Sequence, residues 1–466
     1  MRRSLSIVGT VLVLVLAALS SSPAKDARLK NASRLPARNG WTFVHLQGTP
    51  AEIGFQHGYL LAPEIEDTLQ VLKAETVHDT AKDWEFFRKA AEEMMWPKID
   101  QEYREEMQGI ADGAVAHGVK LDLWDVVAMN ASLEWSYYVK QYNKEHGVQS
   151  TAKLDAPEHC SAFVATGSYT KDGKVVIAHN NWSSYVDGSR WTIVFDVAPE
   201  KGNHFIMDGL PGVIHSADDF SVNSAGIAIT ETTISGFSGY DPNMVPEFIR
   251  ARKAMQYANS IDEFAKLMTD GNNGGYANDW LIVDSKTNEI ASLELGLKNV
   301  TLEKKRDGYF VGSNFPINEK LAKEETDYDL TNMSLSANAR HVRWNQLMAE
   351  NKGKIDVAAA QKFLADHYDS MEKKTQANER TLCGHYDLSP RSSSWQPAFG
   401  TAGAVQNKAS DSRMISKMQF TAAAGHACGI SFKAADHLKA HAGFEWEKDI
   451  LRDMNAYPWT TFTAQK

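Results

Sequence analysis

Three runs of sequence indicate the fold most clearly: HCSAFVAT (residues 159–166), KDGK (171–174) and VVIAHNNWSSY (175–185). The first and third runs are rich in apolar and β-branched residues, and the Asp-Gly pair between them is typical of a tight turn. The sequence therefore predicts two antiparallel strands, and a turn near residue 171 places Cys160 opposite residue 182, within about two positions. The thiol is then expected beside an imidazole, two amides and an indole, which belong to His179, Asn180, Asn181 and Trp182.

Cys160 has two interpretations at this point. A lone cysteine on an apolar strand is usually a packing residue, because its side chain behaves as a small hydrophobe. The polar run from His179 to Asn181 favours a site, because three consecutive polar groups at the end of an apolar strand need partners when they are buried.

The composition is that of a globular protein. The 466 residues are 43% hydrophobic and 23% charged, which is enough for a large core. The length corresponds to about two or three domains of ordinary size, or to one large sandwich. A net charge of −10 argues against nucleic acid as the main partner, because phosphate binding requires a basic surface. Neutral and zwitterionic lipid substrates are compatible with this charge.

Residues 1–24 are predicted to form a secretory signal peptide. Two arginines precede an apolar run over residues 7–19, and small residues follow up to Ala24. The apolar run is short for a membrane-spanning helix, so cleavage near Ala24 is favoured over an uncleaved anchor. Because no long uncharged apolar run follows, we expect no stable membrane insertion and a secreted, lysosomal or periplasmic location.

The three cysteines are Cys160, Cys383 and Cys428. In an exported chain an odd number leaves one thiol unpaired, and a disulfide between Cys383 and Cys428 would leave Cys160 free. The scattered positions argue against zinc, since Cys428 with His426 is too small a set of ligands. No metal and no cofactor are therefore predicted. Glycosylation sequons occur at Asn31, Asn130, Asn181, Asn299 and Asn332.

The part of the chain before Cys160 is predicted to be mainly a helical layer. Thr49 and Pro50 fit an N-cap and a first helical position, and helical spacing continues over residues 50–145. Residues 146–159 lose all periodicity and form a predicted linker that ends directly at Cys160.

The second half is predicted to alternate strands with helices. Residues 384–412 are rich in serine, glycine and proline and are predicted as a loop, followed by a short segment at 413–424. This order of elements indicates an α+β layered sandwich. Strands are predicted at 41–46, 160–167, 174–181, 191–198, 204–208, 220–223, 226–233, 280–284, 290–295 and 309–312, and helices at 246–257, 261–268, 336–350, 356–368 and 434–441.

Three kinds of cysteine site can be compared with Cys160. A papain-like cysteine begins a helix, whereas Cys160 begins a predicted strand, and a metal site lacks ligands. In an N-terminal nucleophile, the peptide bond before the cysteine breaks. The new α-amine, with a pKa of about 7.7–8.0, then takes the proton of a thiol with a pKa of about 8.5. A strand start that follows a cleavable linker favours this third kind.

Four segments carry a family resemblance. They are CSA (160–162) with AHNNWSSY (178–185), PGVIHSADDF (211–220), SAGIAITETTI (224–234) and YANDWLIVD (276–284). In this order they resemble the phospholipase B-like family, which is named after the removal of acyl chains from phospholipids. Beyond about residue 300 the resemblance thins.

The resemblance implies an N-terminal nucleophile hydrolase fold, which is a four-layer αββα sandwich that cleaves itself between His159 and Cys160. It divides the chain into a helical N-terminal segment with its linker, residues 25–159, and a hydrolase domain, residues 160–466. The same superfamily includes the C45 acyltransferases and peptidases and the bile-salt hydrolases. Bile-salt hydrolases carry Arg-Asn-x-Asp where this chain has residues 179–182 (HNNW), which argues against bile-salt substrates.

Matching positions imply roles for individual residues. Cys160 is the nucleophile, His179 orients or polarises the site, and Asn278 donates a hydrogen bond to the oxyanion. Other family members often carry threonine at position 181. The remaining assignments are Asn181 as a second oxyanion donor, Trp182 as a pocket wall, Thr232 or Thr233 as a pocket residue, and Asp219, Glu231 and Arg340 as substrate-binding residues. Strand-end ties are the alternative for Asp219 and Glu231, and an exposed helix face is the alternative for Arg340 and Arg343.

The expected function is an exported, self-processing cysteine hydrolase that acts on acyl esters or amides of lipid-like substrates. Two alternatives stay open: a C45-type acyltransferase or linear amide hydrolase, and an exported binding protein without activity.

Overall fold

The computed structural model describes residues 26–148, 160–216, 220–391 and 401–465. The predicted signal peptide, most of the predicted linker with His159, and Asp219 lie outside the described residues. Within the described ranges, no helix combines the length and the apolar character that crossing a membrane requires.

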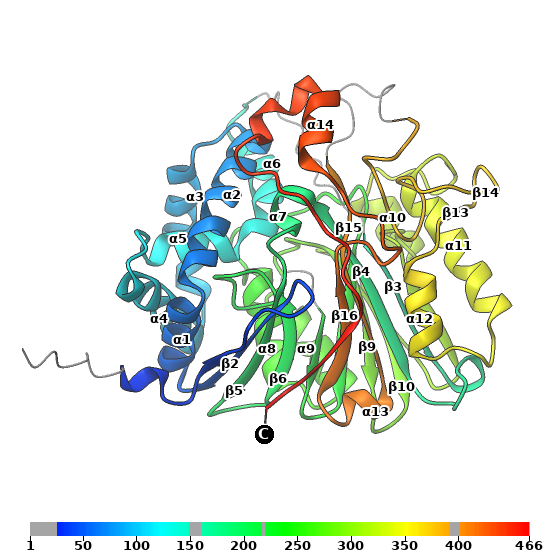
Figure 1. Ribbon diagram of the computed structural model, residues 1–466, viewed down its shortest axis with the longest axis horizontal. Helices are drawn as coiled ribbons and strands as arrows, with labels where there is room; N and C mark the ends of the chain where they lie inside the picture. Colours follow the sequence, from blue (N-terminus) through cyan, green and yellow to red (C-terminus); the bar gives the residue numbers. More distant parts are fainter. Residues whose placement is uncertain (1–25, 149–159, 217–219, 392–400, 466) are drawn as a thin grey trace, which may run out of the picture.

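Two β-sheets lie face to face between two layers of helices (Figure 1), which confirms the predicted α+β sandwich with αββα layers. Neighbouring strands are antiparallel except for the parallel pair β2–β5. The nine-stranded sheet has the order β1 (Ser33–Arg34), β2 (Thr42–Gly48), β5 (Ile193–Pro199), β6 (Phe205–Gly209), β7 (Ser221–Asn223), β8 (Ile227–Thr233), β9 (Asn278–Asp284), β10 (Glu289–Leu295) and β11 (Val300–Lys305). The six-stranded sheet has the order β12 (Gly308–Gly312), β3 (Ser161–Thr166), β4 (Val176–Ser184), β15 (Ala402–Asp411), β16 (Gln419–Ala424) and β17 (Thr460–Thr463). A small hairpin joins β13 (Tyr368–Asp369) and β14 (Lys374–Thr375).

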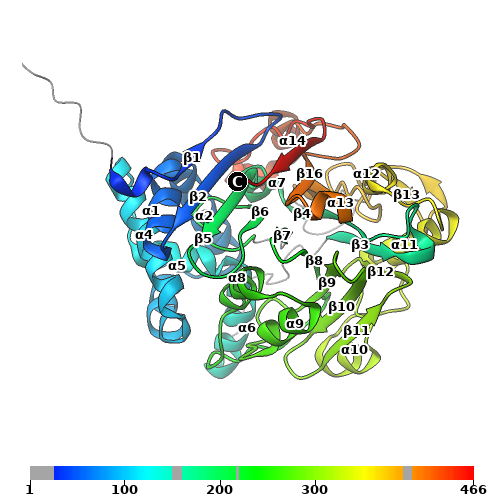
Figure 2. The same ribbon diagram turned by 90° about the horizontal axis from the view of Figure 1, so that it is seen from below.

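The helices lie on opposite outer sides of the sandwich (Figure 2). The nine-stranded sheet carries α1 (Pro50–Leu60), α2 (Ala62–Thr80), α3 (Trp84–Ala90), α4 (Gln101–His117), α5 (Leu123–Asn130), α6 (Trp135–Glu145), α8 (Glu247–Tyr257) and α9 (Ile261–Thr269). The six-stranded sheet carries α11 (Ser336–Glu350) and α12 (Val357–Leu364). Shorter helices are α7 (Tyr185–Gly188), α10 (Glu319–Glu325), α13 (Ser412–Ile415) and α14 (Ala434–Ala440).

Helix α1 begins as predicted. The Thr49 hydroxyl accepts a hydrogen bond from the backbone of Glu52, the Glu52 carboxylate accepts one in return, and Pro50 occupies the first turn. The helix then packs closely on α4. A Cβ atom on Gly54 would lie 1.9 Å from the backbone oxygen of Glu106, so the two helix axes approach only because glycine stands at this position.

Strand β3 shows how the layers are held together. Ala162 and Val164 belong to the apolar cluster between the sheets, whereas Phe163 and Ala165 pack against α11 and α12. Burial on both faces explains the unbroken apolar run in the sequence. The β3–β4 register pairs Ser161 with Asn180, so its continuation places Cys160 opposite Asn181, within the predicted window.

The predicted loop at 384–412 is wrong over residues 402–411. These residues form β15, an interior strand between β4 and β16, and every one of them is buried. Its sequence, AGAVQNKASD, lacks an apolar alternation, and several of its buried polar side chains find partners in the fold. Lys408 lies 2.9 Å from Asp208 of β6, and Asn407 donates to two backbone oxygens. Strands β11, β16 and β17 were not predicted either, because they are short or rich in polar and small residues.

The helical N-terminal segment is also part of the sheet. Strand β2, which precedes the predicted cleavage point, pairs along its whole length with β5, which follows it. The two stretches therefore share one sheet and one core, and two fragments separated at residue 159 would have a structural reason to stay associated.

Candidate active site

Cys160 directly precedes β3 and exposes 3% of its surface. Its backbone nitrogen donates a hydrogen bond to Oδ1 of Asn314, at 2.9 Å. Its thiol lies 3.9 Å from Oδ1 of Asn181 and 3.9 Å from Oε1 of Glu231. One ring nitrogen of His179 lies within 4.8 Å of both the thiol and the Glu231 carboxylate. The structure thus brings a thiol, an imidazole, a carboxylate and an amide together.

Both sheets contribute to this cluster. His179 and Asn181 come from β4 and Glu231 comes from β8, while Asn314 follows the end of β12. His179 faces the cysteine because the hairpin register pairs it with Ala162, two positions after Cys160. The site therefore depends on one local hairpin and on the approach of the second sheet.

Arg340 of α11 holds the backbone around Cys160. Its buried guanidinium donates hydrogen bonds to the carbonyl oxygen of Cys160, to Oγ of Ser161 at 3.0 Å and to Oδ1 of Asn314 at 2.9 Å. Burial lowers the pKa of Arg340 to about 10, so the side chain remains charged at neutral pH. Its neighbour Arg343 makes an ion pair with Asp366 and takes no part in these contacts.

Trp182 completes the wall beside this arginine. The Arg340 guanidinium carbon lies 4.5 Å from the centre of the Trp182 ring, which is a cation–π contact inside the protein. The ring also packs against Cys383 and Ala404. Trp182 is therefore the link between the Cys160 cluster and the C-terminal part of the fold.

Glu231 is fixed by a chain of hydroxyl groups. Tyr276 donates to Oε1 of Glu231 at 3.2 Å and accepts a hydrogen bond from Thr233 at 2.8 Å. The backbone of Tyr276 has a φ of +50°, a left-handed conformation that is uncommon for an aromatic residue. This conformation and the two hydrogen bonds set the direction of the Glu231 carboxylate.

Asn278, Asn181 and Thr232 differ in their surroundings. Both polar ends of the Asn278 side chain, and Nδ2 of Asn181, are buried without a hydrogen-bonding partner among the described residues. Thr232 faces the other sheet, where its hydroxyl would lie 2.5 Å from a Cβ atom on Gly312. The two amides are therefore donors without a partner, and Thr232 is a packing contact between the sheets.

Known proteins that are similar to this chain identify its family. A family model for phospholipase B matches residues 54–458. The chain belongs to the phospholipase B family. Phospholipase B-like 1 of Bos taurus is 23% identical over 80% of this chain and 75% of its own length. A putative phospholipase B-like 1 of Caenorhabditis elegans is 25% identical, and an uncharacterized protein of Archaeoglobus fulgidus is 27% identical. Those matches cover 64% and 54% of this chain, which spans only 57% and 42% of the lengths of these two relatives.

Two solved structures are also similar to this phospholipase B family member. A mutant conjugated bile acid hydrolase of Clostridium perfringens has 9% identity and a TM-score of 0.33, over 56% of this chain and 88% of its own. Penicillin V acylase of Agrobacterium tumefaciens has 13% identity and a TM-score of 0.30, over 57% and 83% respectively.

Sequence reasoning missed two residues of the site in this phospholipase B family member. Asn314 contacts the Cys160 nitrogen, yet it lies in a loop whose only signal is its place just after a strand. Tyr276 lies in the segment 276–284, which carries part of the family resemblance, but the resemblance implied no role for it. Each contacts the site through residues far away in sequence, so no local pattern marks it.

The sequons divide according to burial. Asn181, Asn130 and Asn299 are buried, whereas Asn31 and Asn332 are exposed. A glycan on Asn181 is incompatible with the packing around Cys160, so only the exposed pair are accessible acceptors in this fold.

The remaining cysteines lie together as well. Cys383 and Cys428 are free thiols beside His367 and His385, so the alternative of a disulfide between them is not what the structure contains. The argument against a metal site rested on sequence spacing, and the fold assembles these four side chains from separate segments.

The cluster around Cys160 has the elements of nucleophilic acyl transfer. It contains a buried thiol, a carboxylate and an imidazole near that thiol, and the Asn181 amide, whose nitrogen has no hydrogen-bonding partner among the described residues. These groups are compatible with the breaking of an acyl bond.

Proposed function

We propose that this protein is an exported, self-processing cysteine hydrolase that removes acyl chains from lipid-like esters or amides. One observation supports it most. The Cys160 nitrogen is held by the Asn314 side chain and lies just before the first residue of β3, so it has no place in the sheet ladder. Breaking the bond to residue 159 would leave the sheet intact and the new amine in place.

The first step would be self-cleavage. The Cys160 thiol gives its proton to the nearby Glu231 carboxylate and adds to the carbonyl carbon of His159. The C–N bond then breaks as the nitrogen takes up a proton, which leaves a thioester. Water hydrolyses this thioester to a carboxylate on His159 and a free thiol and α-amine on Cys160. Arg340 and Asn314 hold the backbone in position throughout.

The second step would be turnover of substrate. The α-amine takes the thiol proton, and the thiolate adds to the acyl carbonyl carbon. Asn181 and Asn278 offer buried amide donors for the resulting oxyanion, and His179 polarises the site. The ammonium group protonates the leaving alcohol or amine, and water then releases the acid from the thioester.

The lipid-like substrate is inferred from the names of the relatives. Several are called phospholipase B-like, and the chain spans only part of the length of some of them. Cys160 is buried in the described form, so we propose that cleavage precedes substrate entry. The apolar run at residues 7–19 is the reason to propose export.

The test is to express the full chain, sequence the N-termini of the purified protein and measure fatty acid release. The wild-type protein should contain two associated fragments, about residues 25–159 and 160–466, the second beginning with cysteine. It should release fatty acid from phosphatidylcholine micelles or from an N-acyl amide, and the ratio identifies the preferred bond.

Cys160→Ala should leave one intact chain with no acyl release, and Cys160→Ser should be cleaved slowly. Two fragments from the alanine variant would contradict the mechanism. An intact wild-type chain that releases no acid from either substrate would favour a binding protein.

A further inference from the structure

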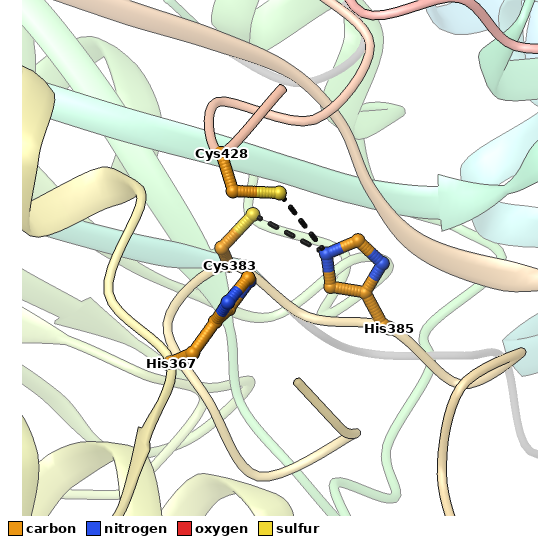
Figure 3. Close-up of side chains that lie close together, drawn as sticks. All are labelled: His367, Cys383, His385 and Cys428. Carbon is orange, nitrogen blue, oxygen red and sulfur yellow. Dashed lines mark hydrogen bonds between the residues drawn. The ribbon is translucent and has the colours of Figure 1, made fainter. Parts of the chain in front are cut away.

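A second polar cluster lies in the C-terminal part of the chain. Cys383, Cys428, His367 and His385 each direct one ligand atom toward the others, and all four atoms lie within 4.8 Å of one another. Figure 3 shows the two sulfur atoms converging on the same nitrogen of His385. The four residues come from the segment between α12 and β15 and from the turn after β16, so the cluster joins separate parts of the fold.

The distances fit a tetrahedral metal centre. Zn²⁺ binds thiolates at about 2.3 Å and imidazoles at about 2.1 Å, so adjacent sulfur and nitrogen ligands of a tetrahedron are separated by about 3.6 Å. In the structure, Nε2 of His385 lies 3.6 Å from the Cys383 sulfur and 3.4 Å from the Cys428 sulfur. The arrangement therefore has the spacing of metal ligands before any side chain moves.

The surroundings support the same assignment. Nδ1 of His385 faces Oδ1 of Asp387 at 3.8 Å, and Tyr185 donates a hydrogen bond to that carboxylate oxygen at 2.7 Å. A carboxylate behind a histidine is the usual support for a metal-binding imidazole.

We propose that Cys383, Cys428, His367 and His385 form a closed, four-coordinate site for Zn²⁺ or a similar thiophilic divalent metal. Two thiolates with two imidazoles are a common ligand set of structural zinc sites, and four protein ligands leave no position for a substrate. The site would be structural and built from residues other than those of the Cys160 cluster.

The position of the site assigns its role. Trp182 packs against Cys383, and a Cβ atom on Gly384 would lie 2.0 Å from the Trp182 ring, so this loop fits tightly behind the indole. A metal would join that loop to the turn that carries Cys428. The metal would thereby fix the position of Trp182, against which Arg340 stacks, and so help to position the Cys160 cluster.

Two other arrangements compete for these side chains, because Cys383 and Cys428 are close enough to oxidise to a disulfide and His385 also lies near Asp387 and His426. A separate group of possible ligands consists of Cys160, His179 and Glu231. Neither of the two latter groups offers more than one thiolate or more than three ligands, which makes each a weaker zinc site.

The experiment measures metal in the full chain, purified without a metal-affinity tag and dialysed against buffer with equimolar zinc and then against metal-free buffer. Mass spectrometry of metals should give one zinc per chain. Cobalt in its place should give tetrahedral bands and sulfur-to-metal charge-transfer absorption, which needs no variant. Cys383→Ser, Cys428→Ser and His385→Gln should each lose at least about 10-fold in zinc affinity. Cys160→Ser and His441→Gln, as thiol and histidine controls, should retain full stoichiometry.

Several results would overturn the proposal. The first is a wild-type chain that binds no zinc after its thiols have been reduced. The second is a chain purified without reductant whose mass is lower by two hydrogens, as a disulfide requires, and which binds no zinc either before or after reduction. Zinc lost from Cys160→Ser but kept by Cys383→Ser would place the metal at the other cluster. Unchanged zinc content in all three cluster variants would equally exclude this site.

Discussion

Cys160 and Cys383 are buried and Cys428 is partly buried, but different groups surround Cys160 and the other two cysteines. Oxygen atoms of Asn181 and Glu231 lie near the Cys160 thiol, whereas a histidine nitrogen lies beside both other thiols. The backbone nitrogen of Cys160 donates to the Asn314 side chain. Burial alone therefore does not assign a role to a cysteine in this fold, and the neighbouring atoms do.

The largest change is expected in reaction rate, and only the Cys160 region should show it. Cys160→Ala should abolish self-cleavage and reduce acyl release by at least about 10³-fold, because it removes the nucleophile. Its zinc content should stay close to that of the wild type, since Cys160 is not one of the four proposed metal ligands. Rates of acid release and metal analysis on the same preparations measure both. Full acyl release from the variant would show that Cys160 is not the nucleophile, and the two cysteine regions would no longer differ in this role.

The second effect is on stability. When free zinc is about 1,000 times the wild-type dissociation constant, Cys383→Ser should lower the free energy of unfolding by about 1.4 kcal/mol if zinc affinity falls about 10-fold, and by about 4 kcal/mol if metal binding to the folded state is lost completely. Urea unfolding at fixed zinc concentrations measures this difference. It should shrink toward the cost of the substitution alone when a chelator removes zinc from both proteins. A difference that is unaffected by the chelator would assign the effect to packing.

The sequence predicted the Cys160 region but not the metal-ligand cluster. Cys160, His179, Asn181 and Trp182 were placed together because a hairpin is local and its register follows from the turn. The layers followed from the apolar runs of strands such as β3. Arg340 was recognised only as one of two alternatives, since helical spacing does not say which face is buried.

The remaining features depend on contacts between distant segments. Asn314 and Tyr276 reach the site through loops with no periodic pattern. Strand β15 was predicted as a loop because its buried polar residues find partners such as Asp208, which no local pattern shows. The metal ligands were dismissed for the same reason: His367 and Cys428 lie on segments that only the folded sheet brings together.

The third effect concerns pH on the Cys160 side of the molecule. Asp279 of β9 pairs in register with Thr232, and burial raises its pKa to about 7 from 3.8, although Ser292 donates a hydrogen bond to it. The folded state therefore holds a proton that the unfolded state has lost, so the stability contributed by this group is complete below about pH 4 and falls as pH rises to about 7.

Asp279→Asn removes this titration. Relative to the wild type, the variant should gain about 3 kcal/mol in free energy of unfolding between about pH 5 and pH 8. Urea titrations at both pH values measure the change. A constant difference across this range would mean that Asp279 ionises in the folded protein as it does in water. Zinc content should not change, because this carboxylate lies outside the metal cluster.

The fourth effect compares two arginines on one helix. Arg340→Lys should lower the free energy of unfolding by about 2–3 kcal/mol and slow self-cleavage, because an ammonium group cannot replace the fork that reaches Cys160, Ser161 and Asn314. Arg343→Lys, the matched control, should cost no more than about 1 kcal/mol, because its partner Asp366 lies nearer the surface. Equal losses from both would show that the Cys160 backbone does not depend on this fork.

The smallest effect tests the link between the regions. Trp182→Phe keeps an aromatic ring but reduces the contacts with Arg340 on one side and Cys383 on the other, so we expect a loss of about 1 kcal/mol in stability. If the metal cluster positions the Cys160 cluster through this wall, the variant should retain its zinc but cleave itself and release acid more slowly. Removal of zinc should then slow the wild type more than it slows Trp182→Phe, because the variant has already lost much of the contact. Equal slowing of both proteins would mean that the two cysteine regions act independently, and that their proximity on either side of one tryptophan serves only packing.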